Sequence, residues 1–159
     1  MTYQPSSNDI VTKTFDLLST HELYELMRLR SQTFVVERAY PYNDFDYHDQ
    51  HCHHAWISCD DVIASYLRIS PPSTSMPMVC ISRVVTHPSH RRKGLCNALM
   101  NWAFNFVAQH FSADIIVRAF TPLCGFYQGL GFQNLSQPYP VDGISQIDMI
   151  RKKHSPRVK

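Results

Sequence analysis

The chain has 159 residues, of which 44% are hydrophobic and 18% are charged, so it has the apolar content of a folded domain rather than of a disordered chain. No apolar run approaches the roughly 20 residues of a membrane-spanning helix, and the polar N-terminus lacks the basic and apolar segments of an export signal. The five cysteines are odd in number and widely spaced, which argues against a disulfide framework. We therefore expect one cytoplasmic domain over residues 1–150, no membrane partner, and a basic C-terminal tail over residues 151–159.

Charge is distributed unevenly along the chain. The formal net charge is +2, but five of the fifteen Lys and Arg lie in the tail, and the other ten against thirteen acids leave residues 1–150 with a charge of −3. Six acids and a single arginine occupy residues 37–61, whereas residues 91–93 are all basic. Because basic charge is confined to one turn and the tail, there is no basic face and no nucleic-acid partner is expected.

A helix is expected near the start of the domain. Ser19 and Glu22 have the spacing of a capping box, and the apolar residues that follow recur at helical spacing, with a break expected near Ser31. The polar and aromatic sequence from Tyr40 to His53 has no period and is typical of a loop. Its length favours a functional loop over a plain connector.

A β-hairpin and a third strand are expected after this loop. Residues 54–58 and 62–70 have the composition of two strands, and Asp60–Asp61 between them predicts the hairpin turn. Residues 78–86 predict a third strand, which ends before Pro88.

Helices and strands alternate in the second half. A helix lying on a sheet is predicted by an apolar stripe at i, i+3, i+4, i+7 and i+11. The stripe consists of Leu95, Ala98, Leu99, Trp102 and Phe106. Residues 114–120 and 145–152 predict strands, and residues 122–131 predict a short helix that ends at Gly129 or Gly131. This order of elements predicts an α/β (α+β) fold in which helices cover a mixed sheet.

The turn "HRRKG" lies between the predicted strand 78–86 and the helix that begins near Gly94. Free backbone N–H groups and the positive end of the helix dipole favour an anion at such a place, phosphate above all. Gly94 would allow a ligand to approach the backbone closely. The alternative is a basic turn that is simply solvated.

This turn, together with "GFYQGLGF" downstream, resembles the acetyl-CoA-binding core of the GNAT superfamily of N-acetyltransferases. The family signature consists of Gln or Arg, two residues of any type, Gly, one residue of any type, and then Gly or Ala. Its fixed positions fall on Arg91, Gly94 and Cys96, so that cysteine stands where the family has Gly or Ala. The resemblance implies a mostly antiparallel sheet of about six to seven strands, with acetyl-CoA as co-substrate. Its pantetheine arm would pair with backbone groups of Val84, Val85 and Thr86, and its pyrophosphate would be held by Arg92, Lys93, Gly94, Leu95, Cys96 and Asn97, beside Arg91.

The upstream sequence "LRSQTFVVERAYPYNDFDYHDQHCHH" resembles the ElaA-like branch of the same superfamily. Two positions depart from the pattern of that branch, since Arg38 replaces its Gln and Tyr40 its usual Cys. The resemblance extends over roughly residues 20–150. The positions that match are Arg30, Phe34 to Glu37, Pro41, Tyr42, Asp44, Asp46, Asp49 and His54.

Acetyl transfer to an amine needs one group that accepts a proton from the amine and another that protonates the leaving thiolate. The resemblance assigns the second role to Tyr127, whose alternative role is that of a packed helix aromatic. Any of five residues in or beside the acidic loop could act as the base through a water molecule, namely Glu37, Asp44, Asp46, Asp49 and His54. Glu37 and His54 are preferred, because each lies at the edge of a regular element. The acidic loop is expected to attract a cationic amine, and Arg83 should pair with one of its acids because an unpaired buried charge is costly. The candidate acceptor-binding residues are Asp44, Asp46, Asp49 and Arg83.

The cluster "HDQHCHH" contains metal-ligand residue types, but no second ligand cluster follows at a suitable spacing, so no metal is expected. The function favoured by the sequence is therefore acetyl-CoA-dependent N-acetyltransfer to a primary amine of a small molecule, a polyamine or a peptide. The alternative is an acyl-CoA-binding module without turnover. A homodimer is a further expectation that the sequence leaves open.

Overall fold

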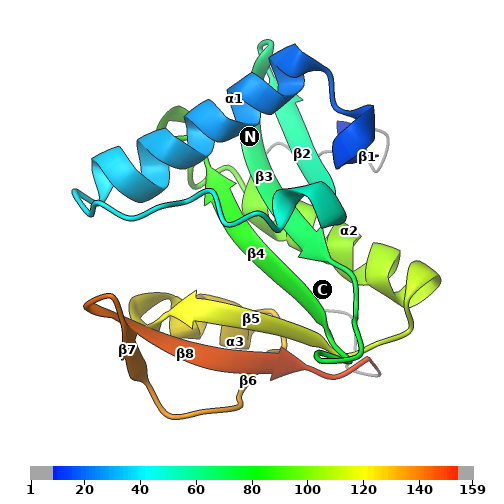
Figure 1. The fold of residues 1–159 in the computed structure, drawn as a ribbon, viewed down its shortest axis with the longest axis vertical. Coiled ribbons are helices and arrows are strands. Elements are labelled where there is room, and N and C mark those ends of the chain that lie inside the picture. Colours follow the sequence, from blue (N-terminus) through cyan, green and yellow to red (C-terminus); the bar gives the residue numbers. More distant parts are fainter. Residues whose placement is uncertain (1–8, 154–159) are drawn as a thin grey trace.

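One mixed sheet of eight strands organises residues 9–153, the part of the chain that the computed structural model describes (Figure 1). The strands are β1 (Ile10–Thr14), β2 (His53–Cys59), β3 (Val62–Ser70), β4 (Val79–Thr86), β5 (Ile115–Phe120), β6 (Gln133–Asn134), β7 (Tyr139–Val141) and β8 (Ile144–Arg151). Their order in the sheet is β1-β2-β3-β4-β5-β8-β6, with β7 also paired to β8, and every pair is antiparallel except β4–β5. The predicted fold class is confirmed, with the short strands β1, β6 and β7 added to those expected from the sequence.

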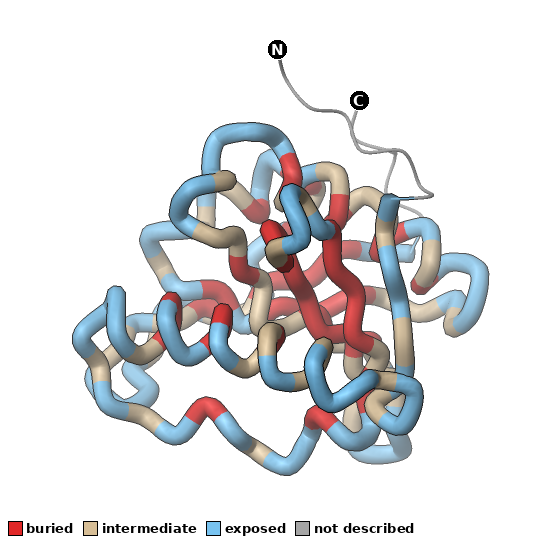
Figure 2. The backbone as a smooth tube through the Cα atoms, turned by 90° about the horizontal axis from the view of Figure 1, so that it is seen from above, coloured by how far each residue is buried: buried red, intermediate tan, exposed pale blue. Residues whose placement is uncertain are grey.

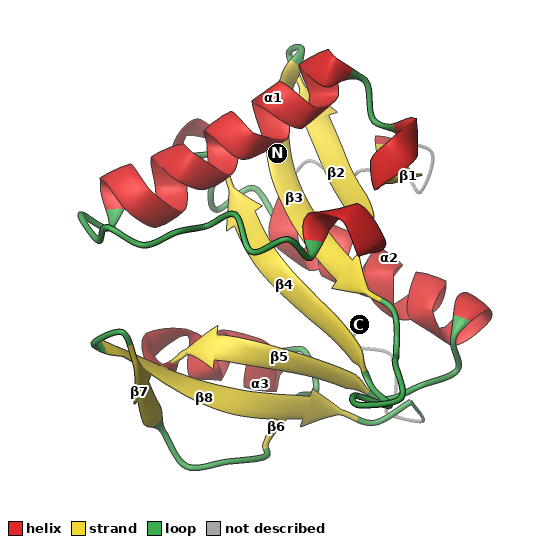
Figure 3. Ribbon diagram, in the orientation of Figure 1, coloured by secondary structure: helices red, strands yellow, loops and turns green. Residues whose placement is uncertain are grey.

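Helices cover both faces of this sheet (Figure 3). The helix α1 (Thr20–Arg30) crosses one face, while α2 (Leu95–His110) and α3 (Cys124–Gly129) cover the other. Short 3-10 turns are η2 (Phe15–Leu17), η4 (Asp49–His51), η5 (Pro88–His90) and η6 (Thr121–Leu123). Within residues 9–153, no helix combines the length and apolarity needed to cross a bilayer.

Local sequence signals set the boundaries of several elements. The capping box is present at α1, because Ser19 Oγ accepts from Glu22 N and the Glu22 carboxylate accepts from Ser19 N. At Ser31 the helix does not break but continues as a π-helix, η3 (Ser31–Glu37). Asp60 and Asp61 have φ of 51° and 60°, as a two-residue hairpin turn requires.

The apolar core has one part on each face of the sheet, and the most buried backbone lies in the central strands (Figure 2). The larger part packs α2 on the sheet, and the smaller part packs Leu26 and Leu29 of α1 against Trp56 and Tyr66. In α2 the predicted stripe is only partly the buried face. Its buried residues are Leu95, Leu99, Met100, Ala103, Phe104 and Val107, whereas Ala98, Trp102 and Phe106 lie at the edge of the core.

The sheet splits between β4 and β5, whose ribbons diverge from a common end (Figure 1). These two parallel strands pair only at Val79–Ile115 and Cys80–Ile116. A bulge in β4, where Arg83 adopts a left-handed φ of 54°, shifts its register against β3. Among residues 9–153, the edge of β4 that faces β5 therefore has no strand partner from Ile81 onward.

The last strand extends one residue beyond the expected domain boundary at residue 150. Arg151 belongs to β8 and is 6% exposed, its guanidinium carbon 4.3 Å from the ring centroid of Phe104 and its Nε donating to the carbonyl of Leu130. Lys152 Nζ pairs with Asp114 at 3.0 Å. The rest of the predicted tail, residues 154–159, lies outside the described residues.

Candidate active site

A cavity of about 820 Å³ occupies the split between β4 and β5. Its size is that of a small-molecule site. One wall comes from alternate residues of β5, and the opposite wall comes from β4 and from the loop before η4. Residues that line it include Cys80, Ser82, Val84, Ile116, Arg118, Phe120 and Tyr127.

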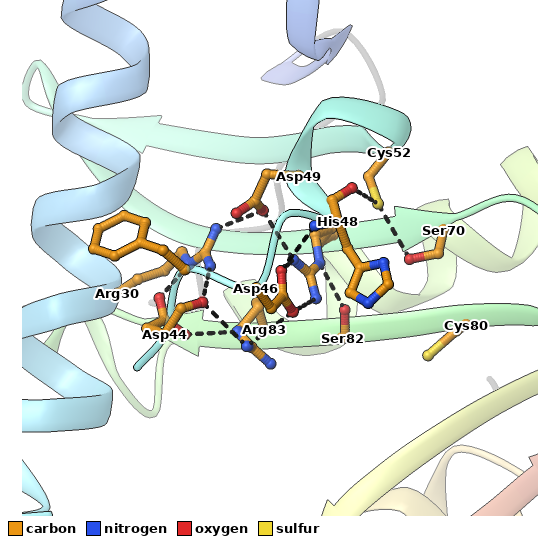
Figure 4. Close-up of polar contacts among 12 residues, drawn as sticks. Arg30, Asp44, Asp46, His48, Asp49, Cys52, Ser70, Cys80, Ser82 and Arg83 are labelled. Atoms are coloured by element: carbon orange, nitrogen blue, oxygen red, sulfur yellow. Dashed lines mark hydrogen bonds and ion pairs between the residues drawn. The ribbon is translucent and has the colours of Figure 1, made fainter. Parts of the chain in front are cut away.

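Three arginines and three aspartates form an ion-pair network beside this cavity (Figure 4). Arg30 contacts Asp44 and Asp49, each at 2.7 Å, and is fully buried. Arg68 contacts Asp46 at 2.8 Å and Asp49 at 3.0 Å, while Arg83 contacts Asp44 at 2.6 Å and Asp46 at 3.1 Å. We call these six residues the Arg–Asp network, and its formal charges cancel. The predicted pairing of Arg83 with an acid of the loop is confirmed.

The arginines of the network neutralise its aspartates. Burial acts to raise the pKa of Asp46, but hydrogen bonds from Arg68 and its charge outweigh burial and hold that pKa well below its usual range. Arg30 lowers the pKa of Asp49 in the same way, again against burial. These carboxylates are therefore ionised and neutralised by arginines. Asp44, Asp46 and Asp49 are each paired with arginines, and their expected role in attracting a cationic amine stays a prediction.

His54 lies in the core and not on the cavity wall. It is fully buried, its Nε2 donates to the carbonyl of Asp49 at 2.9 Å, and its Nδ1 lies 2.8 Å from the hydroxyl of Tyr66. Burial lowers its pKa, which favours the neutral ring. With both nitrogens engaged and no exposure, His54 does not reach an acceptor, so the structure argues against its expected role as base.

Glu37 is paired with the basic turn. Both of its carboxylate oxygens lie 2.6 Å from Arg91, whose Nε also donates to the carbonyl of Thr86 at 3.2 Å. The hydrogen bonds from Arg91 lower the pKa of Glu37, which weakens it as a base. This pair joins the end of η3 to the connection between β4 and α2, so Glu37 is better described as a structural partner of Arg91 than as a catalytic base.

The rest of the basic turn is open to solvent at the start of α2. Arg92, Lys93, Gly94 and Asn97 are exposed, and Gly94 precedes the helix with a left-handed φ of 80° and no side-chain cap. Leu95 is buried in the core, so its backbone alone faces the turn. The uncapped first turn retains the free N–H groups expected of an anion site.

Val85 and Cys96, two of the residues expected to bind acetyl-CoA, are less accessible than the basic turn. Val85 is 4% exposed and packs in the core on the α1 side, whereas Val84 lines the cavity. Thr86 Oγ1 lies 3.1 Å from Ser65 Oγ. Burial raises the pKa of Cys96 to about 12, so its thiol is protonated at neutral pH.

Tyr127 faces the cavity from α3. It is 7% exposed and packs edge-to-face against Phe126 and Phe132. Burial, followed by the neighbouring Cys96, raises its pKa above the usual value, so the phenol is protonated at neutral pH. Its hydroxyl has no hydrogen-bond partner among residues 9–153. The arrangement thus combines the packed aromatic and the available proton donor that the sequence offered as alternatives.

Two wall residues were not assigned a catalytic or acceptor role from the sequence. His48 is exposed on the wall, and its ring projects toward the part of β4 that carries Ser82 and Cys80 (Figure 4). Arg38 follows η3 and lies against two aromatic rings of the wall. The sequence marks both residues, since Arg38 departs from the motif of the ElaA-like branch and His48 belongs to the histidine-rich run.

That histidine-rich run does not converge on one point. His53 packs against Phe106 of α2 with ring centroids 5.2 Å apart, whereas His54 stacks on Tyr66 on the other face of the sheet. Strand alternation in β2 therefore separates neighbouring ligands. In the described part of the chain, no group of three or more His, Cys, Asp or Glu is placed to hold a metal ion.

Comparisons with known proteins agree with this geometry. The model of the acetyltransferase (GNAT) domain matches residues 14–153. The protein ElaA of Escherichia coli is 32% identical over 139 residues, which cover 85% of this chain and 90% of ElaA. The crystal structure of an acyl-CoA N-acyltransferase from Pseudomonas aeruginosa has a TM-score of 0.84 and 32% identity, covering 90% of this chain and 98% of that one. The structure of ElaA has a TM-score of 0.83 and 29% identity, with the same coverage. The chain therefore belongs to the GNAT family, in its ElaA-like branch, and is an acyltransferase.

Proposed function

We propose that the protein transfers an acetyl group from acetyl-CoA directly to a primary amine in the split between β4 and β5. The observation that carries this proposal is that an edge of β4 and the hydroxyl of Tyr127, both without a partner within residues 9–153, lie in the same cavity. The amine nitrogen forms a bond to the thioester carbonyl carbon, and the carbon–sulfur bond breaks. Tyr127 then protonates the departing thiolate, and a base takes the proton that the amine loses.

The donor is proposed to bind along β4 toward α2. Backbone groups of Val84, Val85 and Thr86 would pair with the amides of pantetheine, since this edge of β4 has no strand partner among the described residues. The pyrophosphate would lie on the uncapped first turn of α2, from Arg92 to Asn97. Arg91 would support this turn through its pair with Glu37. All five cysteines are unpaired, which supports action in a reducing compartment such as the cytoplasm.

His48 is the base in this proposal. The carboxylate of Asp46 on the same wall is held ionised by Arg68 and Arg83 and is a weak proton acceptor. His48, by contrast, exposes an imidazole that has no partner among residues 9–153. It can take a proton from the amine directly or through a water molecule.

The donor site is tested by a matched pair of substitutions at Gly94. A Cβ at this position meets no atom within 4 Å, and both Asp and Asn tolerate a left-handed φ, so Gly94→Asp and Gly94→Asn differ mainly in charge. Repulsion between Asp and the pyrophosphate should weaken acetyl-CoA binding about 10- to 100-fold relative to Asn, and less at high salt. Calorimetric titration of each variant gives the affinity. Equal affinity of the two variants would place the pyrophosphate elsewhere.

The base is tested by comparing two histidines of the cavity wall. His48→Gln keeps a polar side chain that cannot take a proton, so kcat/KM for the amine should fall about 10²-fold. His51 also lines the cavity, and His51→Gln is the matched control, expected to stay within about twofold of the parent. Rates are followed as CoA release at saturating acetyl-CoA. Equal rates for the two variants would exclude His48 as the base.

A further inference from the structure

The charged side chains on the cavity wall differ in whether they form ion pairs. Four arginines and two aspartates line it, namely Arg38, Arg68, Arg83, Arg118, Asp46 and Asp142. Arg68, Arg83 and Asp46 belong to the Arg–Asp network, and Arg118 lies 3.9 Å from Asp148. Among residues 9–153, Arg38 is the arginine of this wall that has no carboxylate within 4.0 Å. Within the described part of the chain, the wall therefore presents one arginine whose charge no ion pair balances.

The surroundings of Arg38 fix its orientation. Its guanidinium carbon lies 5.2 Å from the ring centroid of Phe34 and 5.3 Å from that of Phe120. Phe34 belongs to η3 and Phe120 ends β5, so the guanidinium connects two sides of the split. Contacts of this kind use the flat faces of the guanidinium and leave the N–H groups on its edge available. A planar fork of donors matches a carboxylate or a phosphate.

The acids near the cavity determine whether its wall can also bind a cation. The three aspartates of the Arg–Asp network are already neutralised by arginines, which weakens their attraction for an ammonium group. Asp142, on the turn between β7 and β8, is exposed. Arg38 is also exposed, but two aromatic rings of the wall hold its guanidinium in place. The wall thus favours an anion over a second cation.

Resting on the proposed function, we propose that the acceptor amine carries an anionic group, a carboxylate or a phosphate, and that Arg38 binds it. Arg38 then selects the acceptor, while Tyr127 and His48 handle the protons. A polyamine fits this wall poorly, because it would bring additional positive charge to an arginine without a counterion.

The first test is a panel of amines that differ in the anionic group. It contains L-tyrosine, L-tyrosinamide and tyramine, together with phosphoethanolamine and ethanolamine, so that carboxylate and phosphate are separated. One of the two sets, the tyrosine compounds or the ethanolamine compounds, will contain the better acceptor. Within that set, the parent protein should prefer the anionic amine about 10- to 100-fold in kcat/KM, as a charge-assisted bidentate contact provides. Arg38→Gln should bring that ratio close to one. Arg118→Gln removes a charge from the same wall and should keep the ratio within about twofold.

Three results would overturn this proposal. One is a parent protein that prefers the neutral amines or a diamine. Another is an Arg38→Gln variant that retains the preference for the anionic amine. The third is an Arg38→Gln variant that loses acetyl-CoA affinity while keeping the amine ratio, which would assign Arg38 to the phosphates of the donor.

A second measurement does not depend on turnover. The Nε–Hε signal of Arg38 in ¹⁵N-labelled protein, assigned with Arg38→Lys, should shift on titration with N-acetyl-L-tyrosine and not with N-acetyl-L-tyrosinamide. An unchanged signal with the acid, or equal shifts with both compounds, would overturn the anion site. A protein that shows the selective shift but neither binds acetyl-CoA nor releases CoA would contradict the proposed function and support the anion site.

Discussion

Tyr127→Phe is expected to lower kcat by about 10²- to 10⁴-fold while acetyl-CoA affinity and folding stability stay near the parent values. The substitution removes the proton donor and keeps the ring, which packs against Phe126 and Phe132. Because the hydroxyl has no hydrogen-bond partner among residues 9–153, its removal breaks no bond within this part of the protein. The thiolate would then have to leave without its proton.

A second tyrosine provides the control for this experiment. Tyr139 lies on β7, and its hydroxyl donates to Asp148 at 2.6 Å. Tyr139→Phe should keep kcat within about twofold of the parent, since this residue does not line the cavity. Single-turnover kinetics establish whether chemistry limits the rate. If chemistry is limiting and Tyr127→Phe reacts at the parent rate, Tyr127 is a packing residue only.

Arg30→Met is expected to lower the free energy of unfolding by about 3–5 kcal/mol. Arg30 is fully buried and binds Asp44 and Asp49, which are 4% and 5% exposed. Methionine fills much of the space of the arginine stem but leaves the two carboxylates with fewer partners and no water to replace them. Chemical denaturation followed by circular dichroism measures the difference.

Arg28→Met in the same helix is the control, because the Arg28 pair with Glu25 is 3.6 Å long and its arginine side chain is 58% exposed. It should change stability by less than about 0.5 kcal/mol. A loss below about 1 kcal/mol for Arg30→Met would show that the Arg–Asp network contributes little.

The same network should make the parent sensitive to acid. Despite burial, Arg30 lowers the pKa of Asp49 in the folded state. The stability that this residue contributes is therefore present above its unfolded pKa of about 3.9 and is lost as the pH falls through the lower folded pKa.

Elements with a strong local signal could be predicted from the sequence. The capping box at Ser19 and the turn at Asp60–Asp61 depend on neighbouring residues, and both are present. β1 was missed because it is a five-residue edge strand whose pairing, for example Ile10 with Ile57, joins distant parts of the chain. β6 and β7 have two and three residues and carry too short a pattern to be recognised.

A feature of the site could be predicted from the sequence where the physical argument concerned a single residue. The pairing of Arg83 followed from the cost of an isolated buried charge. The sequence did not predict that the acidic loop is neutralised. The arginines that pair with it, Arg30, Arg68 and Arg83, come from three separate elements. The partners of His54 and Glu37 could not be predicted for a related reason, since the sequence does not show which side chains meet after folding.

The central claim, acetyl transfer within the split between β4 and β5, is tested most directly by following the acetyl carbon itself. The parent protein is mixed with acetyl-CoA labelled with ¹³C at the carbonyl and with each amine of the panel, and the label is followed by NMR. The account predicts that the thioester signal is replaced by an amide signal as free CoA appears in equal amount, and that Tyr127→Phe slows this change. A thioester signal that persists with every amine, or that is converted to acetate alone, would contradict it.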